Sequence, residues 1–385
     1  MPADGAPLRP GSATAAAELL RAATGQGRSV RICAGGSKSA GLSPADVCIS
    51  TEELHGISTY ARDDLYVVVG AGTRLDELQA TLNKDGMWVP LASPWPTATV
   101  GGIVATNFNA PLRMRYGGLR DLVLAATVAL PDGRVIRAGR PVVKNVAGYD
   151  LPKLYVGSYG TLGLIADVTF KLMPLPRTRA SLVVPLANLE QGLALGARLL
   201  SLCLVASALL LVKPMPDSPD LGAGSRLALV YTCEGHPADV AAELALVRAE
   251  LGAVGLRELE EQAELSGSDL WANWMAAAGK ARAPTLRVGV GARDLPEMLR
   301  AGTVSGAAFL ADLAGGLLYL HAAPDSDTIR LMAEAAEGYA VVLPIGAPQA
   351  DAGRSGYSPE GHAQMHALRA CFGAEGRLNP GAFLG

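Results

Sequence analysis

The stretch Gly157–Ile165, with the sequence GSYGTLGLI, decides how the chain is expected to fold. It leads directly into an apolar run that predicts a β-strand over Leu164–Lys171. Two more glycine clusters lie upstream, AGGSKS at residues 34–39 and TVGGIVATN at residues 99–107. Glycine admits a ligand close to the backbone, and bare N–H groups suit an anion such as a pyrophosphate. Three such loops therefore predict a long ligand held along the main chain.

Two better-known glycine motifs do not fit these loops. Residues 67–72, VVVGAG, open like the G-x-G-x-x-G loop that binds nicotinamide dinucleotides, but Leu75 stands where the third glycine is needed. Residues 157–160, GSYG, miss the G-x-S-x-G elbow of serine hydrolases by one position. The sequence therefore favours neither a nicotinamide-binding Rossmann site nor a serine hydrolase.

Length and composition bound the class of protein. The 385 residues suggest two domains, or one domain with a large insertion, and hydrophobic residues make up 50% of the chain against 18% charged residues. With 33 basic and 36 acidic side chains the net charge is −3, so no nucleic-acid partner is expected. Residues 1–30 lack the continuous apolar core of a secretory signal, and we expect a cytoplasmic protein.

Cysteine and histidine show no clear metal pattern. The five cysteines contain no C-x-x-C pair, so we expect reduced thiols and neither zinc nor an iron–sulfur cluster. His362 and His366 stand four residues apart on an expected helix, but they lack the glutamate of H-E-x-x-H and a third ligand, and we expect exposed side chains. Three arginines either hold a carboxylate or a phosphate or lie in a solvated loop: Arg113, Arg115 and Arg120.

One apolar stretch raises the question of a membrane span. Residues 193–212, LALGARLLSLCLVASALLLV, have about the length of a spanning helix, but Arg198 interrupts them. We instead expect a helix that ends near Cys203, followed by a strand at Ala208–Val212.

Other apolar runs alternate with turn signals along the whole chain. Pro131-Asp132-Gly133 predicts a hairpin between strands at 122–130 and 135–137. Composition changes at Pro176, where we expect a domain boundary. Further expected helices cover 13–24, 75–82, 186–200 and 237–251, and further expected strands cover 30–33, 66–69, 227–232, 286–290 and 317–321. The middle segment therefore predicts an α+β layer with an antiparallel sheet.

Five segments occur in an order that identifies a family resemblance. They are AGGSKSAG, VVVGAGTRLDEL, ATVGGIVATN, RYGGLRDLVLAATVALPDGRVI and VKNVAGYDLPKLYVGSYGTLGLI. Together they resemble the FAD-binding domain of the vanillyl-alcohol oxidase (PCMH-type) flavoproteins, and within them the E subunits of bacterial glycolate oxidases. The resemblance covers residues 31–176, and LNPG at 378–381 matches the closing segment of the family. It implies an α+β fold: a two-part FAD-binding domain at 1–176, an α+β cap for substrate or partners at 177–346, and a segment at 347–385 that returns to the first domain.

The resemblance also implies which residues hold FAD. For the pyrophosphate it implies Gly35, Gly36, Ser37 and Ser39. Along the diphosphate and ribityl chain it implies Thr99, Gly101, Gly102, Thr106 and Asn107. Beside the flavin and the adenine it implies Gly157, Ser158, Gly160, Thr161, Gly163 and the backbone of Ile165. Glycine and small hydroxyl or amide side chains suit these roles.

Three departures from the family pattern limit what the resemblance implies. Relatives that attach FAD covalently use His or Cys, whereas the matching position here is Ser37, so non-covalent FAD is expected. The GDGN-x-H metal-and-base motif of self-sufficient relatives is absent from the sequence. His321 stands alone in an expected strand, where packing is the more favoured role. No catalytic residue is assigned, and no metal is expected.

The activity implied by the resemblance is oxidation of glycolate to glyoxylate by a glycolate dehydrogenase (glycolate oxidase) complex. This chain would be its FAD-binding subunit, with a second FAD subunit and an iron–sulfur subunit as partners. Contact with the membrane, at its inner face, would come only through those partners. Two alternatives stay open: a self-sufficient FAD-dependent dehydrogenase for D-lactate or another 2-hydroxy acid, and a structural subunit with a vestigial FAD.

Overall fold

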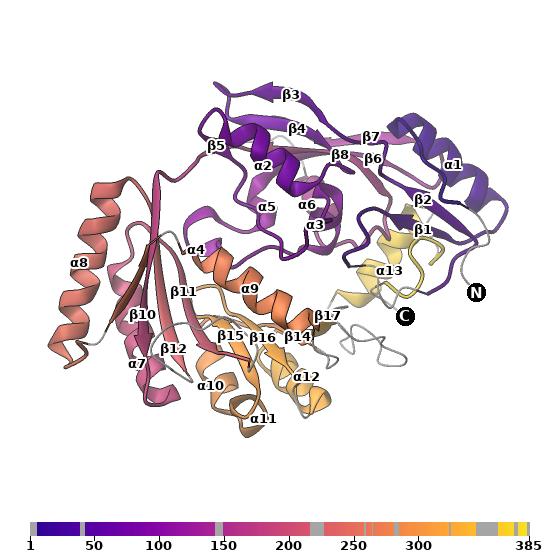
Figure 1. Ribbon diagram of the computed structural model, residues 1–385. Helices are drawn as coiled ribbons and strands as arrows, with labels where there is room; N and C mark the ends of the chain where they lie inside the picture. The colour runs from indigo at the N-terminus through magenta and orange to yellow at the C-terminus, as the bar shows by residue number, and fades with distance from the viewer. Residues whose placement is uncertain are drawn as a thin grey trace.

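The computed structural model describes residues 6–38, 43–142, 149–215, 227–257, 259–263, 265–280, 285–322, 325–343, 361–372 and 376–382. These residues form a mixed helix-and-sheet fold with two large sheets, which Figure 1 shows in different parts of the molecule. The chain crosses from the first sheet to the second between Pro174 and Thr178, beside the boundary expected at Pro176. We call the part before this crossing, together with residues 361–382, the first unit, and residues 177–343 the second unit.

The first unit is built on a five-stranded antiparallel sheet in the order β3-β4-β8-β6-β7. A parallel pair, β1 and β2, and a short pair, β5 and β9, complete its strands. The strands are β1 (Val30–Cys33), β2 (Val47–Ser50), β3 (Ile57–Ala61), β4 (Tyr66–Gly70), β5 (Met87–Trp88), β6 (Val123–Ala129), β7 (Val135–Gly139), β8 (Leu164–Lys171) and β9 (Met173–Pro174). The helices are α1 (Ala13–Gly25), α2 (Leu75–Asn83), α3 (Val100–Thr106), α4 (Arg113–Tyr116), α5 (Leu119–Leu122), α6 (Pro152–Tyr155) and α13 (His362–Cys371).

The second unit is one eight-stranded sheet in the order β13-β10-β12-β11-β15-β16-β14-β17, and every neighbouring pair with a recorded register is antiparallel. Its strands are β10 (Thr178–Pro185), β11 (Ala206–Lys213), β12 (Ala228–Gly235), β13 (Glu260–Ala263), β14 (Thr285–Gly289), β15 (Ala308–Asp312), β16 (Leu317–His321) and β17 (Tyr339–Leu343). Its helices are α7 (Leu189–Leu199), α8 (Pro237–Ala253), α9 (Gly267–Lys280), α10 (Leu295–Arg300), α11 (Gly302–Ser305) and α12 (Ser326–Ala335), with a 3-10 turn at Leu200–Leu202.

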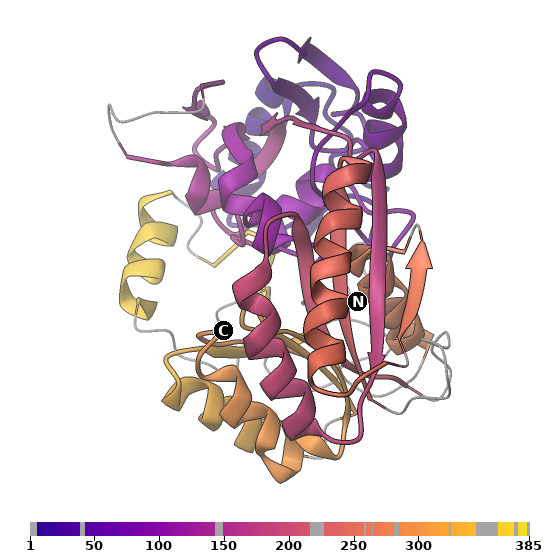
Figure 2. The same ribbon diagram turned by 90° about the vertical axis from the view of Figure 1, so that its left-hand side faces the viewer.

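Both faces of the large sheet are covered, which explains its apolar central strands. Helices α7 and α8 lie over the outer face, as Figure 2 shows, and α10 to α12 continue that layer. Helix α9 lies between the inner face and the first unit (Figure 1), where Trp271 and Phe108 belong to one hydrophobic cluster. Strand β11 is therefore buried along almost its whole length, and an apolar run without alternation is the expected sequence for such a strand.

Residues 193–212 fold as the sequence predicts. Helix α7 ends at Leu199, the 3-10 turn follows, and strand β11 begins at Ala206. Among the helices of the described residues, none combines the length and the apolar character that crossing a membrane requires. The hairpin at Pro131–Gly133 is also confirmed: Asp132 Oδ1 accepts a hydrogen bond of 3.0 Å from Arg134 N, and Gly133 has φ +90°.

Two expectations require correction. The glycine cluster at residues 99–107 is not an open loop, because Val100–Thr106 forms helix α3 with Thr99 as its N-cap. The expectation of reduced thiols is wrong for one pair, since Cys33 and Cys48 form a disulfide with a Cα–Cα distance of 6.7 Å. Strand β2, which the sequence did not indicate, pairs in parallel with β1 and brings the two cysteines together. Cys203, Cys233 and Cys371 are free thiols.

Candidate cofactor site

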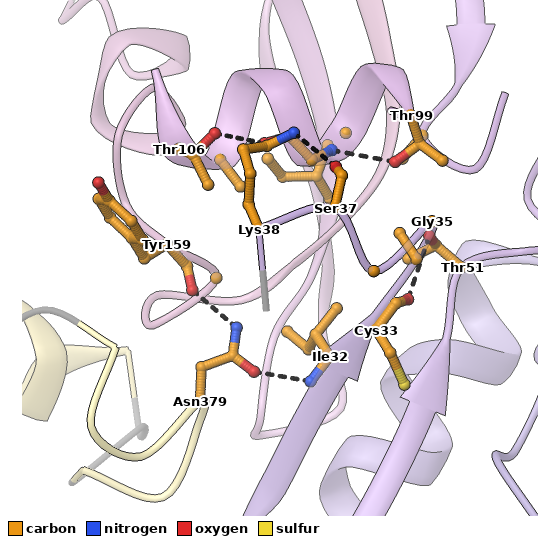
Figure 3. A pocket seen from close by; sticks show the side chains of 18 of the residues that line it. Ile32, Cys33, Gly35, Ser37, Lys38, Thr51, Thr99, Thr106, Tyr159 and Asn379 are labelled. Atoms are coloured by element: carbon orange, nitrogen blue, oxygen red, sulfur yellow. Dashed lines mark hydrogen bonds between the residues drawn. The ribbon is translucent and has the colours of Figure 1, made fainter. Parts of the chain in front are cut away.

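A cavity opens in the first unit where four segments meet (Figure 3). These are the end of strand β1 with the loop after it, helix α3, the segment 159–165, and Asn379 of the C-terminal segment. All three glycine clusters of the sequence therefore border one space. Ten residues with an expected FAD role line it: Gly35, Gly36, Ser37, Thr99, Gly101, Gly102, Thr106, Gly160, Gly163 and Ile165.

Helix α3 presents its small residues to this cavity. Thr99 Oγ1 accepts a hydrogen bond of 3.3 Å from Gly102 N, which caps the first turn, and Thr106 Oγ1 donates to Gly102 O at 2.7 Å. Both hydroxyls thus have partners within the helix. A Cβ at Gly101 would lie 2.6 Å from Ala71 Cβ, so this glycine is required where α3 packs beside strand β4. A Cβ at Gly102 would approach only Thr99 Oγ1, at 3.2 Å.

The loop after strand β1 packs tightly against the backbone before α3. A Cβ at Gly35 would lie 1.6 Å from Thr97 O, a distance that no side chain can adopt. Gly35 therefore brings two backbone segments together at the edge of the cavity. Because the main chain itself forms this wall, a ligand in the cavity can approach the backbone closely.

Asn379 joins the C-terminal segment to two other walls of the cavity. Its Oδ1 accepts a hydrogen bond of 2.7 Å from Ile32 N, and its Nδ2 donates to Tyr159 O at 2.7 Å, as Figure 3 shows. The side chain is 6% exposed, and its backbone has φ 44°, a left-handed conformation that asparagine tolerates better than most residues. The LNPG motif is thus placed where its asparagine fixes the shape of the site.

Lys38 is the one formally charged side chain among the described residues that line the cavity. Its Nζ donates to Ser37 Oγ at 3.0 Å and lies 5.0 Å from the centre of the Trp95 ring. The cation–π contact stabilises the ammonium group only partly, and burial lowers the pKa of Lys38 to about 8. Among the described residues, the cavity therefore carries an excess positive charge, because no carboxylate lines it.

Four residues with an expected FAD role do not line the cavity but support its walls. Gly157 N donates to Val104 O at 3.0 Å, Ser158 Oγ to Tyr155 O at 2.9 Å, and Thr161 Oγ1 to Ser158 O at 2.6 Å. Asn107 adopts a left-handed conformation and ends helix α3. Ser39 lies outside the described residues. For all fifteen residues, the contact with FAD stays a prediction.

Sequence reasoning missed several lining residues, of two kinds. Lys38, Tyr159 and Asn379 lie inside motifs that the sequence had singled out, AGGSKS, GSYG and LNPG, so only their roles were missed. Ala34, Ala71 and Ala105 also lie inside quoted motifs but carry no polar side chain, whereas the places of Ile32, Cys33 and Thr51 at the cavity depend on the fold.

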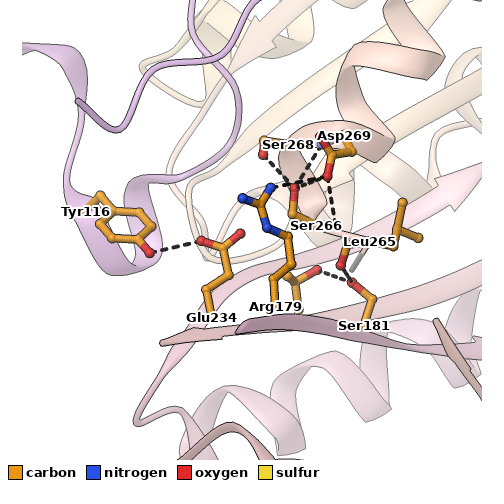
Figure 4. Close-up of polar contacts among 9 residues, drawn as sticks. Tyr116, Arg179, Ser181, Glu234, Leu265, Ser266, Ser268 and Asp269 are labelled. Atoms are coloured by element: carbon orange, nitrogen blue, oxygen red, sulfur yellow. Dashed lines mark hydrogen bonds and ion pairs between the residues drawn. The ribbon is translucent and has the colours of Figure 1, made fainter. Parts of the chain in front are cut away.

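A polar seam joins the two units away from the cavity (Figure 4). Across the two units, the Tyr116 hydroxyl of α4 donates to Glu234 Oε2 of β12 at 2.9 Å. Beside it, within the second unit, Arg179 lies 3.6 Å from Asp269. Tyr116 and Arg115 line a groove between the units, so the structure places Arg115 at this seam and not at the cavity. Arg113 and Arg120 are exposed.

His321, Trp271 and Trp274 are all buried side chains of the second unit. His321 is 7% exposed, its Nδ1 lies 3.1 Å from Thr285 Oγ1, and burial lowers its pKa. Trp271 and Trp274 are buried in the core on the inner face of the large sheet. The side chain of His362 lies outside the described residues, and within those residues no three His, Cys, Asp or Glu side chains gather as a metal site would require.

Comparison with known proteins now identifies the ligand class of this cavity. Residues 6–139 match the family model of an FAD binding domain. The matched part carries the first two glycine clusters and includes most of the strands of the first sheet. The match indicates FAD as the cofactor, and the residues fit it: glycine backbone forms the walls, and Lys38 offers a cation to the diphosphate.

Similar proteins carry names from 2-hydroxy-acid oxidation. Over 148 residues the chain is 38% identical to a D-lactate dehydrogenase from Anaerostipes hadrus, a match that covers 38% of this chain and 31% of the relative. Over 129 residues it is 40% identical to the glycolate oxidase subunit GlcE from Escherichia coli (strain K12), covering 33% of this chain and 37% of the relative. The matches thus span well under half the length of these curated relatives.

A solved structure supports the fold over nearly the whole chain. Alkyldihydroxyacetonephosphate synthase superposes with a TM-score of 0.66 at 14% sequence identity, covering 97% of this chain and 75% of that protein. At such low identity, the likeness supports the arrangement of the two units and carries no statement about substrate.

Proposed function

We propose that this chain is the FAD-binding subunit of a glycolate dehydrogenase (glycolate oxidase) complex. The complex oxidises glycolate to glyoxylate, and its electrons leave through a second FAD subunit and an iron–sulfur subunit. Bound FAD supplies the chemistry of accepting a hydride. Residues 1–176 with 347–385 form the FAD-binding unit of this proposal, and residues 177–346 the cap. The subunit is cytoplasmic and reaches the membrane only through its partners.

The observation that carries the proposal is the cavity itself. It brings the three glycine clusters together, one cationic side chain lines it among the described residues, and the segment that matches the FAD binding domain forms much of its wall. The similarity to GlcE supports the choice of glycolate and of a multi-subunit enzyme. Support for dependence on partners comes from the sequence, in which the GDGN-x-H motif and closely spaced cysteines are absent.

The FAD is non-covalent in this proposal, because Ser37 occupies the position where covalently flavinylated relatives carry His or Cys. Acid precipitation of the flavin-loaded protein is expected to release all yellow colour into the supernatant. Flavin that stays with the pellet after washing would contradict non-covalent attachment.

Co-purification from the native host tests the function as a whole. A tag on this chain is expected to retain two further polypeptides, with more than one flavin per complex, non-haem iron, and glycolate-dependent reduction of a quinone analogue. A chain that purifies alone from native extract, with FAD and without iron, contradicts the subunit assignment. Disulfides such as Cys33–Cys48 are uncommon in cytosolic proteins. Counting free thiols in the same preparation therefore tests the cytoplasmic location: a reduced pair supports it, and an intact disulfide contradicts it.

A second function is favoured by a specific observation. The D-lactate dehydrogenase relative matches a longer stretch of this chain, 148 residues, than GlcE does, 129 residues. This favours a self-sufficient FAD-dependent dehydrogenase for D-lactate or a similar 2-hydroxy acid. The isolated chain would then reduce dyes with D-lactate, which the glycolate dehydrogenase subunit does not.

A further inference from the structure

The cavity contains a cation that no side chain among the described residues neutralises. In the part of the chain that the structure describes, no carboxylate forms an ion pair with Lys38, and its polar contact is the neutral Ser37 hydroxyl at 3.0 Å. Other charged residues of the first unit mostly lie at the surface, where water screens them. Lys38 is half-buried, and a cation removed even partly from water without a counter-ion is costly, so such a group is expected to have a partner in the functional state.

The position of Lys38 indicates where on a ligand its charge acts. Lys38 follows the Gly35–Ser37 backbone directly, and its ammonium group lies between that loop and helix α3, as Figure 3 shows. The loop wall consists of main chain packed closely against Thr97 O, and exposed backbone of this kind suits an anion. The Trp95 face, 5.0 Å away, holds the ammonium group at this place.

We propose that Lys38 is the counter-charge of the FAD diphosphate in this chain. The inference rests on the proposed FAD function and assigns to one side chain the neutralisation of the two phosphate charges. Backbone N–H groups of the loop position the diphosphate, and the Lys38 ammonium donates a charge-assisted hydrogen bond to a phosphate oxygen. Lys38 is thus a binding residue and takes no part in hydride transfer.

Binding of three ligands to the apoprotein tests this assignment. FAD contains the diphosphate and the flavin, ADP contains only the diphosphate end, and riboflavin contains only the flavin end. Lys38→Met removes the charge with little change in side-chain length, and Lys38→Arg retains the charge. Lys84→Met is the matched control, because Lys84 is an exposed lysine outside the cavity. Isothermal titration calorimetry measures each dissociation constant at two salt concentrations.

The expected pattern separates the diphosphate from the flavin. Lys38→Met should weaken FAD and ADP about 10- to 100-fold, the usual effect of losing one charge-assisted hydrogen bond. Riboflavin affinity should not change, and Lys38→Arg should recover most of the FAD affinity. Salt should weaken FAD binding more in the wild-type protein than in Lys38→Met, because the variant lacks the attraction that salt screens.

Three outcomes overturn the inference or its premise. Equal FAD affinity in the wild-type protein and Lys38→Met overturns the role of Lys38 while leaving FAD binding intact. A parallel loss of riboflavin and FAD affinity places the lysine at the flavin and overturns the diphosphate assignment. If the wild-type apoprotein binds no FAD, the proposed function fails first. Thermal unfolding without ligand identifies a folding defect in Lys38→Met, and Lys38→Gln then replaces it in the same comparison.

Discussion

The Tyr116 hydroxyl donates a hydrogen bond of 2.9 Å to Glu234 Oε2 across the junction of the two units. Glu234 is 2% exposed, and burial raises the pKa of its carboxyl group. Burial and the neighbouring carboxylate also raise the pKa of Tyr116. This contact therefore couples helix α4 of the first unit to strand β12 of the large sheet.

Removing the Tyr116 hydroxyl should destabilise the protein. Tyr116→Phe leaves a buried carboxylate without its donor, and we expect the free energy of unfolding to fall by about 1–3 kcal/mol. Urea denaturation measures this loss. Glu234→Gln should lose less, because a neutral amide is cheaper to bury. In the double variant the two losses should not add; strict additivity would mean that the two side chains are not coupled.

The raised pKa of Glu234 predicts a pH dependence with a definite sign. The folded protein holds the Glu234 proton to higher pH than the unfolded chain, so stability falls as pH rises from the ordinary glutamate range through the folded pKa. Tyr116, Arg179, Arg115 and Asp269 are the charged or titratable groups that act on it. Chemical denaturation at several pH values should show this decline in wild-type protein and lose it in Glu234→Gln.

Gly101 and Gly102 should respond differently to substitution although both line the cavity. In Gly101→Val the new side chain meets Ala71, so we expect overpacking to cost about 1–3 kcal/mol of stability and FAD to be lost as a consequence. In Gly102→Val the new Cβ meets only the Thr99 hydroxyl, at 3.2 Å, which a small shift of that side chain relieves, so the variant should fold while its side chain takes up cavity volume. Flavin content and apoprotein melting temperature measure both effects. A Gly102→Val protein with full FAD content would contradict the assignment of Gly102 to the wall of the FAD site.

Asn379 should be required for FAD affinity and not only for stability. Its replacement leaves Ile32 N and Tyr159 O without their partners, which loosens two walls of the cavity. Asn379→Gly keeps the left-handed backbone free of strain, whereas Asn379→Ala adds about 1 kcal/mol of strain. We expect both variants to bind FAD about tenfold more weakly, from a loss of ~1.4 kcal/mol, and Asn379→Ala to melt at the lower temperature. Unchanged FAD titration curves in both would contradict this role.

Local sequence patterns predicted those strands and turns that depend only on residues close together in the sequence. Strand β8 and the Pro131–Gly133 hairpin follow from apolar runs and turn residues, and the motif order placed the cavity loops in one unit. Helix α3 was missed because two glycines in its first turn read as loop, while Thr99 caps it and Ala71 packs against it. The Cys33–Cys48 pair was missed because the parallel register of β1 and β2 brings together residues fifteen positions apart.

FAD binding should weaken at alkaline pH because of Lys38. Burial lowers the pKa of Lys38 to about 8 in the empty cavity, and an anionic diphosphate would raise it. Above about pH 8, FAD binding must therefore be accompanied by protonation of the Lys38 amine, and the FAD dissociation constant should rise up to about tenfold per pH unit. Tyr159 is the other residue with a titratable side chain that lines the cavity among the described residues, apart from the disulfide-bonded Cys33. Fluorescence titrations between pH 6 and 10 test this, and a flat profile for Lys38→Met is the control.

The isolated chain, even loaded with FAD, should turn over glycolate and D-lactate negligibly with artificial dyes. Oxidation of a 2-hydroxy acid needs a base for the hydroxyl proton and a cation for the carboxylate, both held within reach of the flavin. His321 is a poor base for this purpose, because it is buried beside Thr285, and the sequence has no GDGN-x-H motif. Activity should return when the partner flavin and iron–sulfur subunits are added. Robust dye reduction by the purified chain alone would reject the subunit assignment and favour the self-sufficient D-lactate dehydrogenase.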